Sequence, residues 1–168
     1  MDGSERYLSC MREIKKRVNI IKWMLHKEMA IDHKLFHTEF ISLQFRSITE
    51  LILLANLSAH KTLYNKGCEK LKNEWRIKSI LQFLKSVNTD FYPLPVTETF
   101  SEENPNIPIY LSLYTGFLSL EDLGIIYDTC NNYIHPKNPF AEERNYIILK
   151  IWKTKLKNRL LWKKQLKY

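Results

Sequence analysis

The chain has 168 residues and a mass of 20.2 kDa, with 26 basic and 18 acidic residues, so its formal net charge is +8. Hydrophobic residues make up 45% of the chain and aromatic residues 12%, which excludes wholesale disorder and collagen-like or low-complexity sequence. A chain of this length can bury roughly 70% of its unfolded surface without a metal or a disulfide. We therefore expect a single domain over residues 1–168.

Signals for membrane insertion, secretion and metal binding are weak in this sequence. No apolar run reaches the ~18–20 residues of a membrane span, so we expect no transmembrane segment, and residues 1–5 lack the basic and apolar regions of a signal peptide. Cys10, Cys68 and Cys130 are odd in number and widely spaced, which favours reduced thiols in a cytoplasmic protein. The five histidines form no HExxH motif, and we expect neither a metal nor a cofactor.

The first half of the chain contains no proline before residue 93, which permits long helices. The first predicted helix runs from Glu5 to Lys27, with Asp2 or Ser4 as its N-cap. Apolar residues recur there at alternating spacings of four and three, as in a helix of a bundle: Tyr7, Met11, Ile14, Val18, Ile21 and Leu25. The opposite face carries Arg12, Lys15, Lys16, Lys22 and Glu28, and indicates a solvated basic surface.

The second predicted helix, Phe36 to Tyr64, is apolar on most sides, which is typical of the central element of a core. A narrow polar seam interrupts it at Glu39, Ser42, Arg46, Thr49, Asn56 and His60. Glu50 follows Arg46 by one turn, so the two side chains can form an ion pair. Two roles stay open for Arg46. It either makes this structural pair, which we favour, or points at a site elsewhere in the chain.

The remaining elements are predicted from the periodicity of apolar residues, from the positions of prolines and from helix-capping residues. A third helix covers Leu71 to Val87, and an extended insertion follows around residues 89–118, because prolines disfavour helix in the residues before them. A short β-hairpin is one form of this insertion, packed on the helices by its aromatic side chains. A fourth helix starts at Ser119, with Asp122 completing a capping box, and ends at Asn131 or Asn132. The last helix runs from Asn138 and Pro139 to Lys167.

The excess charge is concentrated at one end of the chain. Residues 145–168 contain eight basic and no acidic residues, so residues 1–144 contain 26 − 8 = 18 basic and 18 acidic residues. A nucleic-acid contact surface is the favoured interpretation, whereas an amphipathic membrane-surface helix and a merely solvated face stay open. The candidate nucleic-acid contacts are Lys150, Lys153, Lys157, Arg159, Lys163 and Lys164.

One short stretch carries a family resemblance. Cys130-Asn131-Asn132-Tyr133-Ile134-His135, just before the final helix, resembles the motif of the HEPN superfamily (higher eukaryote and prokaryote nucleotide-binding). That motif is an Arg, four to six residues, and a His, and Asn131 and His135 match its second half. The resemblance implies an all-α, antiparallel HEPN-like helical bundle. It also implies a homodimer with the motif at its interface.

The resemblance further implies RNA chemistry. In active members the His assists attack of the ribose 2′-OH on the phosphate, and the Arg stabilises the developing charge without a metal. Here Cys130 occupies the Arg position, and Thr129 or Asp128 would occupy it at longer spacings, so no cation is present. Either another residue substitutes, or the chain binds RNA without cutting it. The candidate substitutes are Arg46, Lys137 and Arg144.

The candidate catalytic residues are His135, Asn131, Arg46 and Glu50. The leading functional hypothesis is an RNA-binding or RNA-cleaving protein of toxin–antitoxin or phage-defence type. The alternative is a catalytically inert dimeric interaction module or an antitoxin-like regulator with a cognate partner protein, and a peripheral membrane protein is the third. Because the motif lacks its Arg, we expect weak or no ribonuclease activity.

Overall fold

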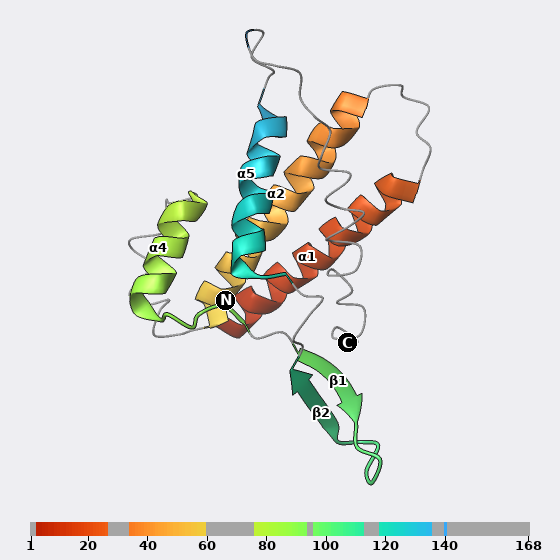
Figure 1. Cartoon of the computed structure of the whole chain (residues 1–168). Helices are drawn as coiled ribbons and strands as arrows, with labels where there is room; N and C mark the ends of the chain where they lie inside the picture. Colours follow the sequence, from red (N-terminus) through yellow and green to blue (C-terminus); the bar gives the residue numbers. More distant parts are fainter. Residues whose placement is uncertain are drawn as a thin grey trace.

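A computed structural model of the chain describes residues 3–26, 34–59, 76–93, 96–112, 118–135 and 140 (Figure 1). In chain order the described elements are α1 (Gly3–His26), α2 (Lys34–Ala59), α4 (Ile77–Val87), β1 (Val96–Phe100), β2 (Pro108–Ser112) and α5 (Leu120–Ile134). Most of the described residues are helical, and the strands form one small sheet. The prediction of a helical protein with a hairpin inserted in it is therefore confirmed at this level.

The body of the molecule is built from α1, α2 and α5, with α2 packed against both of the others (Figure 1). The predicted stripe of α1 supplies Met11, Ile14, Val18 and Ile21 to the core, all of them buried. They meet Ile41, Phe45, Ile48 and Ile52 of α2 and Leu123, Ile126 and Cys130 of α5 in one apolar cluster. The prediction that α2 is the central helix is confirmed, because its apolar side chains contribute to two clusters at once.

The length and composition of α2 also suit a membrane span. Among the described residues, Leu35–Ala59 is the one helical stretch long and apolar enough to cross a bilayer. However, 61% of its most apolar window is buried within the protein. Burial of that extent is what the core helix of a helical bundle requires.

The helix α4 completes a second apolar cluster beside α2. Its buried residues Ile77, Ile80 and Leu84 pack with Leu53 and Leu57 of α2, Phe91 and Tyr127. The prediction of one continuous helix from Leu71 is wrong, because Arg76 has an extended backbone (φ −75°, ψ 119°) and immediately precedes α4. Residues 71–75 lie outside the described residues. Apolar periodicity alone did not reveal the break, since the stripe continues through Arg76 in the sequence.

The hairpin itself is confirmed, and the predicted packing of the insertion by aromatic side chains is confirmed for Phe91 and Tyr92 but is wrong for the strands. The strands β1 and β2 pair antiparallel, with Val96 opposite Ser112 and Phe100 opposite Pro108. They project away from the helices (Figure 1), and Phe100 and Tyr110 are 57% and 62% exposed. The aromatic residues that do pack precede the strands: Phe91 is buried, and the Tyr92 hydroxyl donates to the Leu118 carbonyl oxygen at 2.7 Å.

The helix α5 begins as predicted. The Ser119 hydroxyl accepts from the Asp122 backbone N–H, and the Asp122 carboxylate accepts from the Ser119 backbone N–H, which completes the capping box. The helix ends at Ile134, two or three residues later than expected. The predicted last helix, Asn138 to Lys167, lies outside the described residues apart from the exposed Phe140, and so do residues 60–64 of the second predicted helix.

Candidate functional site

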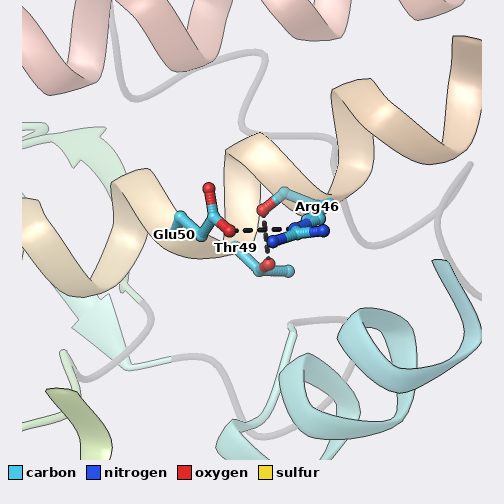
Figure 2. Close-up of polar contacts among 3 residues, drawn as sticks. All are labelled: Arg46, Thr49 and Glu50. Carbon is cyan, nitrogen blue, oxygen red and sulfur yellow. Dashed lines mark hydrogen bonds and ion pairs between the residues drawn. The ribbon is translucent and has the colours of Figure 1, made fainter. Parts of the chain in front are cut away.

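The charged centre of the helical body lies on α2. Arg46 Nε donates to Glu50 Oε1 at 3.0 Å, and the Thr49 hydroxyl donates to the Arg46 carbonyl oxygen at 2.7 Å (Figure 2). The side chains of Arg46 and Glu50 are 32% and 28% exposed, so the pair is partly removed from water. The predicted i,i+4 ion pair is thus confirmed. Because the spacing is local, helix formation alone brings the two groups together.

A residue of α5 completes the surroundings of this cation. The guanidinium carbon of Arg46 lies 5.3 Å from the centroid of the Tyr127 ring, which is cation–π geometry. Partial burial acts to lower the pKa of Arg46, but the hydrogen bond to Glu50 and the nearby Tyr127 and Glu50 outweigh it and raise that pKa. The guanidinium therefore stays charged. Tyr127 was not among the predicted site residues, because its only signal in the sequence is its position one turn before Cys130.

Cys130 lies beside the same cation. Burial raises the pKa of its thiol to about 12, against the lowering effects of a hydrogen bond with the backbone of Arg46 and of the Arg46 charge. Cys130 is the residue that stands where the resemblance expects an Arg. The structure therefore brings a cation from α2 next to that position of α5. It does so with Glu50 already bound to the cation.

Asn131 and His135 lie further along α5. They follow Tyr127 by four and eight residues, so the helical repeat places all three on one side of α5. Each step of four residues advances about 6 Å along the axis. Asn131 is half-buried, whereas His135 is exposed and ends the helix with an extended backbone (φ −81°, ψ 148°). Arg46 and Glu50 are thus brought to Tyr127, and His135 lies about two turns beyond that contact.

Most of the polar seam of α2 has a structural explanation. Ser42 is buried and donates to the Thr38 carbonyl oxygen at 2.7 Å, and the buried Thr49 makes the equivalent bond to Arg46. Hydroxyls satisfied within their own helix need no partner from another element. Asn56 is also buried, and within the part of the chain that the structure describes its Nδ2 has no hydrogen-bond partner. His60, the last member of the seam, lies outside the described residues.

The remaining predicted site residues cannot be placed within the described ranges. The candidate nucleic-acid contacts are all in residues 141–168, and the candidate cations Lys137 and Arg144 are likewise outside the described residues. In the ranges that the structure does describe, no three His, Cys, Asp or Glu side chains gather in a way that could hold a metal ion.

Charge is segregated among the described elements. The helix α1 contains six basic and two acidic residues, whereas residues 96–112 and 118–135 each contain three acidic and no basic ones. On α1, Arg12 and Lys16 are exposed, Trp23 is 52% exposed, and the acidic Glu13 pairs with Arg17 at 3.0 Å. The helix α1 therefore carries exposed basic residues together with a half-exposed aromatic side chain.

Comparison with known proteins adds no identification. No family model, no curated protein and no solved structure matches the chain. The candidate site is accordingly interpreted from its own geometry and charge.

Proposed function

We propose that this chain is a HEPN-like RNA-binding protein of toxin–antitoxin or phage-defence type that cleaves RNA weakly or not at all. The observation that carries the proposal is the outer face of α1, which presents exposed Arg12 and Lys16 together with the exposed Trp23 on a helix of net charge +4. The basic residues of segment 145–168 add a further +8.

The chemistry of these groups suits single-stranded RNA. Cations bind the phosphates and release condensed counterions, which makes affinity dependent on salt. An exposed indole offers a face on which a base can stack, and such stacking contributes without regard to sequence. The acidic hairpin and α5 would repel the same polyanion, so binding is expected on the α1 side of the molecule.

The test is fluorescence anisotropy with a labelled single-stranded RNA at several salt concentrations. If about four cations reach phosphates, log K should fall against log[salt] with a slope of roughly −3 to −4. Changing Lys153, Lys157 and Lys164 to Glu should abolish binding. The double variant Arg12→Glu, Lys16→Glu should weaken binding at least about tenfold, because like charges would then face the phosphates.

The matched control lies on α4, where Lys78 and Lys85 are both exposed. The double variant Lys78→Glu, Lys85→Glu changes the net charge by the same amount but leaves α1 intact. It should bind RNA within about twofold of the wild type. Equal losses in the α1 and α4 variants would mean that net charge alone governs binding, and unchanged affinity in both basic-face variants would refute the proposal.

The alternative function is a catalytically inert regulator or interaction module. The observation that favours it over an active ribonuclease is the ion pair, since a guanidinium held by Glu50 and stacked on Tyr127 is poorly placed to stabilise a phosphate. Robust cleavage would contradict both functions, because neither includes an active ribonuclease. RNA binding separates the two, since an interaction module or regulator that acts through a protein partner needs no affinity for RNA.

A further inference from the structure

Among the described residues no strand pairs with the outer edge of β2, and the hydrogen-bonding pattern of that edge is defined. The Ser101 N–H donates to the Ile107 carbonyl oxygen at 3.1 Å, one position beyond the Phe100–Pro108 pair. Because hydrogen-bonded and non-hydrogen-bonded pairs alternate in an antiparallel ladder, Tyr110 forms a non-hydrogen-bonded pair with Glu98. The N–H and C=O of Tyr110 therefore point away from β1, and so do those of Ser112.

The side chains of β2 are exposed on both faces of this hairpin. All five residues of β2 are exposed, among them Ile109, Tyr110 and Leu111. An apolar strand of this kind is typical of a sheet covered or extended by other elements. A two-stranded hairpin is marginal by itself in water, and three or more strands are needed for independent stability. A free strand edge is also a template for pairing with another chain.

We propose that β2 pairs antiparallel with β2 of a second copy of this chain, about a twofold axis through Tyr110. The four-stranded sheet then has the order β1, β2, β2 of the second copy, and β1 of the second copy. Tyr110 exchanges both backbone hydrogen bonds with its own counterpart. The Ser112 N–H donates to the Pro108 carbonyl oxygen of the second copy. Proline has no N–H, so the reciprocal bond from Pro108 to the Ser112 carbonyl oxygen is missing at each end of the strand pair.

The side chains of β2 favour a second copy of this chain as the partner that pairs with this edge. In that register Ile109 lies opposite Leu111 of the second copy, so four aliphatic residues form one continuous strip across the twofold axis. The strand β2 itself carries no charge, so no like charges face each other within the β2–β2 pair. Pairing through β1 would instead place Glu98 opposite its own counterpart, where like charges are destabilising.

The experiment changes Tyr110, because in the proposed dimer this residue lies opposite its own counterpart. Wild-type protein should dimerise reversibly in sedimentation-velocity and light-scattering measurements over a wide concentration range. Tyr110→Lys alone and Tyr110→Glu alone should each be monomeric, with dissociation constants raised at least about tenfold, because identical charges would lie directly opposite each other. A mixture of the two variants should regain the dimer, since Lys then faces Glu.

The control is Thr99→Lys, which adds the same charge to the exposed face of β1 away from the β2 edge, and it should leave the dimer intact. Circular dichroism should show the same helical content in every variant. A wild type that is monomeric throughout would overturn the proposal, leaving the edge to a foreign peptide or to solvent. Persistent dimers in both single variants, or no recovery in the mixture, would equally overturn it. None of these measurements involves RNA, so a failure of the dimer proposal can be distinguished from a failure of the RNA-binding proposal.

Discussion

Arg46 is a charged side chain on the most apolar helix of the protein, and its neighbours explain how it is tolerated. Glu50 supplies the counter-charge at 3.0 Å, and the Tyr127 ring lies 5.3 Å from the guanidinium carbon. Neither member of the ion pair is more than about a third exposed, so water screens it incompletely. The same contacts that permit the charge also hold α5 against α2.

Replacing Arg46 should therefore destabilise the fold. We expect Arg46→Ala to lower the free energy of unfolding by about 1–2 kcal/mol, because Glu50 loses its partner in a half-buried position and Tyr127 loses the cation. Urea unfolding followed by circular dichroism measures the change. Lys78→Ala, at an exposed position of α4, should shift stability by no more than about 0.5 kcal/mol. Equal stability of Arg46→Ala and wild type would show that the pair is no more than a surface ion pair.

Cys130 gives a pH dependence of stability with a definite sign. Burial raises its pKa to about 12 in the folded protein, from about 9 for a free thiol. Below pH 9 the thiol is protonated in both states and full stability is present. Above it the unfolded state ionises first, so stability should fall by up to roughly 1.4 kcal/mol per pH unit toward pH 12.

Urea titrations of the wild type and of a Cys130→Ala variant at pH 8 and pH 10 measure how much this thiol contributes to the pH dependence of the free energy of unfolding. Cys130→Ala should be less stable at pH 8, because the smaller side chain leaves a cavity, but it should lose less stability on going to pH 10. All other groups are common to both proteins, so the difference between them reports the thiol. Parallel pH dependence in wild type and variant would contradict a buried, protonated Cys130.

At the scale of elements, α5 is the helix whose start is specified most clearly. The Ser119 side chain and the Asp122 side chain each satisfy a backbone N–H that the first turn leaves without a helical partner. We expect Ser119→Ala to lower stability by about 1 kcal/mol, as is usual for loss of an N-cap hydroxyl. Thermal or urea unfolding checks this value.

Ser9→Ala is a suitable control for that substitution. Ser9 is exposed in the interior of α1, where alanine has the higher helix propensity, so this variant should be unchanged or slightly more stable. A Ser119→Ala variant as stable as Ser9→Ala would mean that tertiary packing alone fixes the start of α5.

At the scale of the whole molecule, the packing of α5 on α2 decides the chemistry available to the motif. It places Arg46 at Cys130 and Tyr127, while His135 lies at the end of α5. We expect little or no RNA cleavage by the wild type, and no change in His135→Ala, because the cation is held by Glu50 and by Tyr127, which lies eight residues before His135 in the chain. The measurement is cleavage of labelled RNA by both proteins, with folding checked by circular dichroism. Robust cleavage that disappears in His135→Ala while the fold persists would show that the protein is a ribonuclease.

Features that depend on residues close together in the chain could be predicted from the amino-acid sequence. The apolar stripe of α1, the Arg46–Glu50 pair and the Ser119–Asp122 capping box follow from helical periodicity and from spacings of three or four residues. The hairpin was predictable as one form of the proline-bounded insertion, since its strands are close in sequence. These interactions need no knowledge of how the elements pack.

Contacts between elements that are distant in the chain could not be predicted from the sequence and are defined by the packing of the fold. That Tyr127 stacks on Arg46, that Cys130 lies beside the same cation, and that β1 and β2 stand clear of the helices all depend on the rotation and position of one element relative to another. Periodicity identifies the apolar face of a helix but not which residues of another helix will cover it. The break at Arg76 was missed for a related reason, because the stripe of Ile80 and Leu84 extends without interruption into the preceding sequence.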